Sequence, residues 1–154
     1  MDYLITLKRI PKSEKVQFMI MAEDYFNELD PQFSPSSYWI TNYFPRLLSN
    51  PDLFLKWIFI ETLIVGFVLY GTSKHLYKEK QIGTIYDFYV EPSYRRKGIA
   101  KNAASLVIKE IEEMNVGKIQ LEIMLDNESA VHFWSQLGFF HITGKYVLSE
   151  RISI

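Results

Sequence analysis

Residues 82–100 read IGTIYDFYVEPSYRRKGIA, and this stretch decides the fold. Ile82–Val90 is rich in branched and aromatic residues, which is typical of a strand. Apolar residues recur at helical spacing from Ile99 to Met114, and a second strand is predicted at Lys118–Leu125. A strand, a helix and a strand in this order predict a parallel crossover, which is right-handed as a rule.

Hydrophobic patterns on either side of this crossover predict further strands and helices. We expect strands at Tyr3–Arg9, Phe54–Ile60, Leu63–Tyr70, Phe139–Ile142 and Tyr146–Ser149, and helices at Ser13–Leu29, Ser36–Phe44 and Asp126–Leu137. Pro45 should kink or end the second helix, because its ring clashes with the preceding turn. The expected fold is α/β (α+β), a mixed sheet of about seven strands with four helices. With 154 residues and no linker, residues 1–154 are expected to form a single domain.

Composition narrows the classes of function. Hydrophobic residues make up 48% and charged residues 23% of the chain, as in a globular protein. The 17 basic and 18 acidic residues argue against a broad nucleic-acid surface. The absence of cysteine excludes disulfides, a thiolate nucleophile and cysteine-ligated zinc. The three histidines do not cluster in sequence, so no metal site is expected.

The start of the chain, Met1–Ile10, carries charges among its apolar residues and lacks the pattern of a signal peptide. No apolar run approaches the length that spans a membrane. We therefore expect a cytoplasmic protein without a membrane partner. A homodimer is left open.

The turn between the strand and the helix has the features of an anion site. A helix that begins near Gly98 presents unpaired N–H groups and the positive end of its dipole. Gly98 and Ala100 are small, so a ligand can approach the backbone closely. Cationic side chains stand at Arg95, Arg96, Lys97 and Lys101. A solvated basic helix start is the other interpretation, but these cations oppose the dipole, so a pyrophosphate explains them better.

Two motifs resemble one known family. Arg95-x-x-Gly98-x-Ala100, preceded by a strand that ends in Val-x-Pro, resembles the acetyl-CoA signature of the GNAT superfamily of N-acetyltransferases. Downstream, Asn127-x-x-Ala130-x-x-Phe133-Trp134-x-x-x-Gly138-Phe139 resembles the later motif of that superfamily, in which asparagine caps a helix ending in Gly-Phe. The resemblance implies a GNAT-like fold, acetyl-CoA as cosubstrate and an amine as acceptor.

The resemblance also implies roles for individual residues. Backbone amides of the turn would hold the pyrophosphate, the end of the preceding strand would pair with the pantetheine arm, and Asn127 would reach that arm. An amide of Tyr89 or Val90 would bind the thioester oxygen as charge develops on it. The predicted cofactor-binding residues are Phe88, Tyr89, Val90, Arg95, Arg96, Lys97, Gly98, Ile99, Ala100, Lys101, Asn127 and Phe133.

The predicted catalytic residues are Asp87 and Tyr89, which face the same side of a strand because side chains alternate. Among apolar neighbours, Asp87 could have a raised pKa suited to a general base. It could instead only bind a cationic substrate or pair with a lysine. Trp134 stands where many family members have a proton-donating tyrosine, and indole cannot do that job. Tyr86 or Tyr89 could substitute as the donor.

Three functions remain open at this point. The first is an N-acetyltransferase for a small amine, and the second acts on a protein N-terminus or lysine. The third is a non-catalytic acyl-CoA-binding sensor or interaction module. Carboxylates and aromatic rings in the two early helices would suit a cationic or aromatic amine, although the same residues also fit solvated helix faces and core.

Overall fold

A computed structural model describes residues 3–148. The chain divides into two compact units with a boundary in the sequence between Glu122 and Ile123, and each unit is described by itself. None of the helices in the described chain combines the length and the apolar character that crossing a membrane requires.

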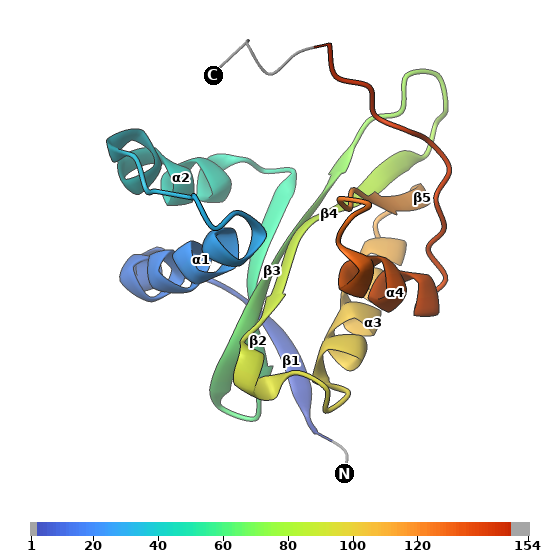
Figure 1. Cartoon of the computed structure of the whole chain (residues 1–154). Coiled ribbons are helices and arrows are strands. Elements are labelled where there is room, and N and C mark those ends of the chain that lie inside the picture. Colours follow the sequence, from blue (N-terminus) through green and yellow to red (C-terminus); the bar gives the residue numbers. More distant parts are fainter. Residues whose placement is uncertain (1–2, 149–154) are drawn as a thin grey trace. The chain divides into compact units, whose positions relative to one another are not determined.

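The first unit is a five-stranded sheet flanked by three helices (Figure 1). In chain order its elements are β1 (Ile5–Arg9), α1 (Lys15–Leu29), α2 (Ser37–Ser49), β2 (Leu53–Ile60), β3 (Leu63–Ser73), β4 (Gln81–Val90), α3 (Ile99–Glu112) and β5 (Val116–Leu121). The spatial order of the strands is the chain order, with β1 to β4 antiparallel and β4 parallel to β5. The predicted parallel pairing across the strand–helix–strand crossover is confirmed. Short 3-10 turns precede α1 (Lys12–Glu14) and follow β4 (Pro92–Tyr94).

The helix α2 extends beyond its predicted end. Ser36 caps it, since its hydroxyl accepts a 3.0 Å hydrogen bond from the Trp39 amide. Pro45 lies inside the helix, which continues to Ser49, so the prediction of an end near Pro45 is wrong. Proline removes one helical hydrogen bond, but buried Phe44 and half-buried Leu47 pack into the core on either side of it. Tertiary packing therefore outweighs the local preference.

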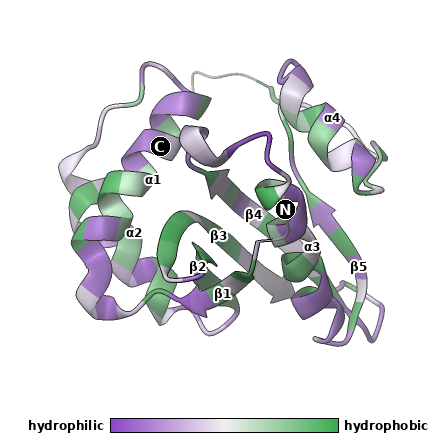
Figure 2. Ribbon diagram, turned by 90° about the horizontal axis from the view of Figure 1, so that it is seen from below, coloured by the Kyte–Doolittle hydropathy of each residue, from purple (hydrophilic) through white to green (hydrophobic). Residues whose placement is uncertain are grey.

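The two faces of the sheet bury separate sets of side chains, because neighbouring residues of a strand point to opposite faces. The face under α1 and α2 buries Phe18, Phe44, Trp57, Phe67 and Tyr89. The face under α3 buries Ile58, Val65, Val90, Ile99 and Ala103. Figure 2 shows the hydrophobic residues along the central strands. Since burying one large apolar side chain contributes about 1.5–3 kcal/mol, these two clusters hold both helix layers on the sheet.

The second unit contains α4 (Glu128–Gln136). The two strands predicted at 139–142 and 146–149 are not present in the described residues, which end before Ser149. The described sheet therefore has five strands and not about seven. Alternation alone does not make a strand, because a strand needs a hydrogen-bonded partner, and Phe140, Ile142 and Tyr146 are exposed here. The predicted mixed α/β class is confirmed, while a single domain over residues 1–154 stays a prediction.

Candidate functional site

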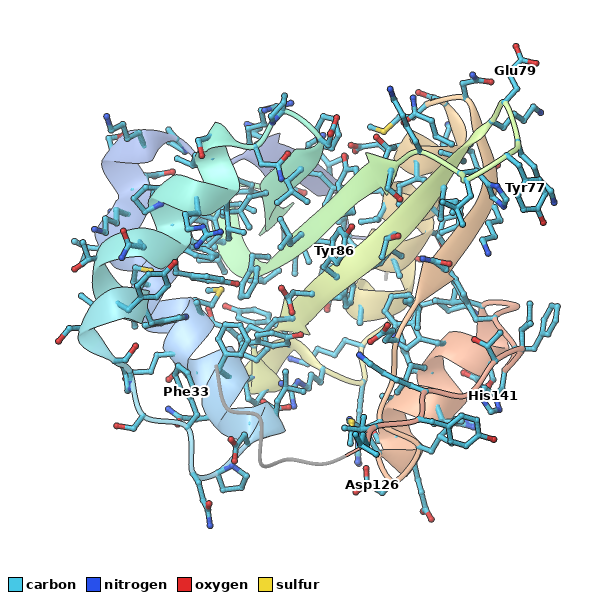
Figure 3. All side chains as sticks on the ribbon, turned by 90° about the horizontal axis from the view of Figure 1, so that it is seen from above. Phe33, Tyr77, Glu79, Tyr86, Asp126 and His141 are labelled. Atoms are coloured by element: carbon cyan, nitrogen blue, oxygen red, sulfur yellow. The ribbon has the colours of Figure 1, made fainter. Side chains whose placement is uncertain are left out.

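The strand β4 changes its pairing at its middle. Its parallel register with β5 runs from Gln81 opposite Val116 to Ile85 opposite Leu121. In the described chain no strand pairs with residues 86–90 on that side. On the other side, the register with β3 shifts so that Tyr86 is left out of the ladder as a bulge. Bulges turn side chains to new directions and are common beside active sites, and Tyr86 lies at the middle of the sheet in Figure 3.

Asp87 follows the bulge and faces α1 and α2. It lies opposite Leu69 of β3, and its Oδ1 accepts a 2.7 Å hydrogen bond from the Tyr25 hydroxyl of α1. Burial raises the pKa of Asp87, while the hydrogen bond from Tyr25 works in the opposite direction. A carboxylate whose pKa is raised by burial can take up a proton near neutral pH more readily than an exposed aspartate.

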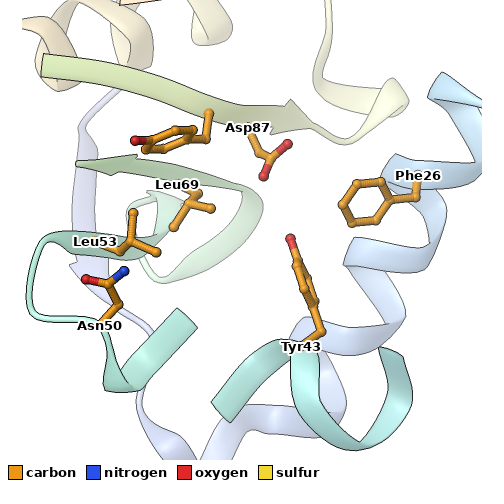
Figure 4. A pocket seen from close by; sticks show the side chains of 7 residues that line it. Phe26, Tyr43, Asn50, Leu53, Leu69 and Asp87 are labelled. Atoms are coloured by element: carbon orange, nitrogen blue, oxygen red, sulfur yellow. The ribbon is translucent and has the colours of Figure 1, made fainter. Parts of the chain in front are cut away.

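Two tyrosine hydroxyls accompany this carboxylate. Burial, followed by the negative charge of Asp87, raises the pKa of both Tyr25 and Tyr43 above the ordinary value for a phenol. Both phenols therefore stay protonated as neutral donors. Figure 4 shows the Tyr43 hydroxyl directed toward Asp87. The Tyr25 ring is held edge-on by Phe67 and Tyr89, at centroid distances of 5.5 and 5.7 Å.

Sequence reasoning did not identify Tyr25. Its position in the sequence could have indicated it, because Tyr25 follows Phe18 and Ala22 at helical spacing. Phe18 and Ala22 are fully buried, so this face of α1 points to the core. A tyrosine on such a face needs a hydrogen-bond partner for its hydroxyl. The helical spacing alone does not reveal that the partner is Asp87, which lies 62 residues further along the chain.

Asp87 lines a pocket of about 510 Å³ in the first unit (Figure 4). Its walls come from α1, α2, the α2–β2 connection, β2, β3 and β4. The lining residues are Phe26, Tyr43, Asn50, Leu53, Leu69, Tyr86 and Asp87. The volume is within the usual range of small-molecule sites, and a mostly apolar wall with a few polar groups is also typical of them.

The turn after β4 leads directly into α3, whose start near Gly98 agrees with the prediction from the sequence. Arg96 and Gly98 have positive φ angles of 61° and 79°, and α3 begins at the next residue, Ile99. No side chain caps this helix, and its geometry leaves the first N–H groups without partners inside the helix. A Cβ added to Gly98 would meet no atom within 4 Å, so its left-handed backbone, rather than close packing, favours glycine here.

Arg95 differs from the other cations of this turn. Its Nε donates to the Val90 carbonyl at 2.8 Å, and its Nη2 donates to Glu28 Oε2 at 2.7 Å. Its backbone N–H donates to the Pro92 carbonyl at 3.2 Å. Arg95 therefore ties the turn to β4 and α1, whereas the cationic residues Arg96, Lys97 and Lys101 are exposed.

The last three residues of β4 divide between the two faces of the sheet. Tyr89 is buried on the face of Asp87, as the alternation predicted, and Phe88 and Val90 pack on the α3 side with Ile99. Burial, then the charge of Glu28 and other nearby carboxylates, raises the pKa of Tyr89, so its hydroxyl also stays protonated.

The second unit holds the other predicted residues. The Asn127 Oδ1 caps α4 by accepting from the Ala130 amide at 3.1 Å. The Phe133 and Trp134 rings meet edge to face at 4.9 Å, and the buried Trp134 also packs on Phe139 at 5.5 Å. Trp134 thus has a packing role in this unit. No cluster of three or more histidine, aspartate or glutamate side chains able to hold a metal occurs among the described residues.

Comparisons with known proteins agree with the motifs. Two curated relatives are L-ornithine N5-acetyltransferase NATA1 of Arabidopsis thaliana (28% identity over 110 residues, 70% of this chain) and spermidine N(1)-acetyltransferase of Escherichia coli strain K12 (26% over 150 residues, 84% of this chain). The chain covers 47% of the length of the first relative and 78% of the second.

Solved structures share the fold across nearly the whole chain. A possible acetyltransferase from Clostridium difficile 630 matches with a TM-score of 0.80 at 18% identity, covering 97% of this chain and 99% of its own. An aminoglycoside acetyltransferase from a soil metagenome, in complex with sisomicin, matches with a TM-score of 0.73 at 18% identity, covering 94% and 97%. These likenesses support the fold.

The profile of the acetyltransferase (GNAT) family matches residues 18–139, which include both motifs. The predicted enzyme class, an N-acetyltransferase, is confirmed at the level of this family. The chain belongs to the acetyltransferase (GNAT) family.

Proposed function

We propose that this protein transfers the acetyl group of acetyl-CoA to a primary amine by direct attack of the amine on the thioester. The observation that carries the proposal is the position of Asp87. It lies in a pocket on the half of β4 that has no β5 partner, twelve residues before Ile99, where α3 begins without a side-chain cap. The two curated relatives are named as acetyltransferases of ornithine and spermidine, which both offer an amine.

The described residues fit the coenzyme at two places. The N–H groups at the start of α3, from Gly98 onward, are the proposed pyrophosphate donors, with Arg96, Lys97 and Lys101 around them. The edge of β4 beyond Ile85 is the proposed partner of the pantetheine arm, because β5 no longer occupies it. Asn127 and Phe133 stay predicted contacts. Acetyl-CoA supplies the activated acetyl group.

Asp87 is the proposed general base. The acceptor nitrogen loses a proton to the carboxylate and forms a bond to the carbonyl carbon, and the C–S bond then breaks. The thiolate leaves without an acid, because a thiol of pKa about 8.5 is a fair leaving group, and it takes its proton from solvent. This route does not need a proton donor at Trp134. The amide of Tyr89 or Val90 is proposed to bind the thioester oxygen.

Binding of the coenzyme is tested by calorimetric titration with acetyl-CoA. We expect saturable binding to the wild type and at least about tenfold weaker binding to Gly98→Val, a loss of about 1.4 kcal/mol. Gly138→Val is the matched control, because Gly138 also has a positive φ and open space at its Cβ. Absence of saturable binding to the wild type would overturn the proposal.

Transfer is tested by thiol release from acetyl-CoA over a panel of small amines and of peptides with free N-termini or lysines. Release with a small amine assigns the small-molecule activity, and release with peptides only assigns the protein activity. Acetyl-CoA binding without release on any acceptor would favour the non-catalytic sensor. A cytoplasmic location and a homodimer stay predictions.

A further inference from the structure

The lining of the Asp87 pocket contains little charge and much apolar surface. Asp87 is the one carboxylate among its lining residues. Phe26, Leu53 and Leu69 offer only apolar surface, and the remaining lining is two tyrosines and the Asn50 amide. The pocket therefore provides one counter-ion and a mostly apolar wall.

From this distribution we infer that the acceptor is an amine with a single positive charge on an apolar or aromatic body, and that a second ammonium group on the acceptor is disfavoured. The inference rests on the proposed function, since it names the acceptor class for the same site. The ammonium group is directed to Asp87 and the body lies along Leu53 and Leu69.

The aromatic part of the wall is held firmly. The Phe26 ring meets Trp39 and Tyr43 edge-on, with centroids 6.2 and 5.7 Å apart, and Trp39 and Tyr43 stack at 5.4 Å. Rings fixed in this way offer a preformed surface for an apolar body at little entropic cost. They also suit a cation that approaches a ring face on its way to Asp87.

Glu28 and Asp24 of α1 do not supply a second counter-ion to the lining. Glu28 pairs with Arg95 at 2.7 Å. The charge of Asp24 acts on Tyr89 and Glu91, and neither acid lines the pocket. A second ammonium group inside the pocket would lose water without gaining a carboxylate, which is unfavourable.

The test compares two acceptors that differ by one ammonium group, n-butylamine and 1,4-diaminobutane. Thiol release gives kcat/KM for each. We expect the wild type to prefer n-butylamine by about tenfold or more, since an unpaired charge in a site costs at least about 1.4 kcal/mol. Equal values, or a preference for the diamine, would overturn the inference.

A variant adds the missing counter-ion. Asn50→Asp places a carboxylate in the lining, and the change preserves the fold because the Asn50 side-chain oxygen accepts from the Asp52 amide at 2.9 Å and a carboxylate does the same. We expect the preference for n-butylamine to fall about tenfold. Asn27→Asp, which adds the same charge at an exposed position outside the lining, should leave the ratio unchanged. An unchanged ratio in Asn50→Asp would contradict the inference.

A binding measurement separates the two proposals. Intrinsic fluorescence of the aromatic wall is followed while either amine is added without acetyl-CoA. Tighter binding of n-butylamine without thiol release would overturn the transfer reaction and leave the acceptor class standing. Thiol release with a preference for the diamine would overturn the acceptor class and leave the transfer reaction standing.

Discussion

The two halves of β4 perform different tasks. Residues 82–85 pair with β3 on one side and β5 on the other, and Gly83, Thr84 and Ile85 are buried. Residues 86–90 lack the β5 partner, begin with the bulge at Tyr86 and carry the partly buried carboxylate of Asp87. A fully paired backbone stabilises the sheet, whereas an unpaired edge and a buried charge both oppose folding. One strand therefore combines a half that stabilises the sheet with a half that carries the proposed general base.

The largest effect is expected at Asp87. Asp87→Asn should lower kcat/KM about 100-fold or more, because a positioned general base contributes at least that much. The same change should raise the melting temperature at neutral pH. Burial raises the pKa of Asp87 above its ordinary value of 3.8, so its ionisation opposes folding once the pH exceeds the folded-state pKa. Asparagine removes that opposition.

The difference in melting temperature between Asp87→Asn and the wild type should depend on pH. It should shrink as the pH falls toward 3.8, where the wild-type carboxyl is protonated. Thermal unfolding of both proteins across the pH range measures it. Asp30→Asn is the control, since the Asp30 side chain accepts from the Gln32 amide and an asparagine oxygen does the same. A lower melting temperature for Asp87→Asn at neutral pH would place Asp87 in the stabilising part of the strand.

In the half of β4 that pairs with both β3 and β5, a substitution should lower stability and leave activity unchanged. A Cβ at Gly83 would lie 2.3 Å from Cγ2 of the fully buried Ile111. Gly83→Ala should therefore reduce the free energy of unfolding by about 1–3 kcal/mol, as overpacking does, with kcat/KM per folded molecule unchanged. Urea unfolding measures the stability. Gly144→Ala, whose Cβ would meet no atom within 4 Å, should change it by no more than about 0.5 kcal/mol. A loss of activity in Gly83→Ala without a loss of stability would contradict the division of β4 into two different halves.

The smallest effect concerns Tyr25. Its hydrogen bond lowers the pKa of Asp87, so Tyr25→Phe should raise that pKa. The acid limb of the kcat/KM profile should move to higher pH, with similar rates on the plateau. Tyr77→Phe, at a residue that is 82% exposed, should leave the profile in place. An equal drop in rate at every pH would show that Tyr25 acts only on packing.

Periodicity predicted the parts of the fold that depend on neighbouring residues. The alternation of β4 placed Asp87 and Tyr89 on one face, and a helix was correctly expected to begin near Gly98, whereas the left-handed backbone of Gly98 was not predicted. Asn127 was correctly expected to cap α4. Local patterns failed where tertiary contacts decided. Pro45 stays helical because Phe44 and Leu47 pack into the core, and the apolar residues after 138 form no strand in the described chain because alternation does not supply a partner.

In the candidate site, too, some features follow from the local sequence and others only from the tertiary structure. The sequence by itself determined the family, the turn around Gly98 and the carboxylate at Asp87, because backbone conformation and strand alternation act over a few residues. Only the tertiary structure joined Tyr25 to Asp87 across 62 residues and Arg95 to Glu28 across 67. It also assembled the pocket wall from α1, α2 and three strands. These partners meet because the two helices pack on one face of the sheet, and no local pattern encodes which side chains that packing brings together.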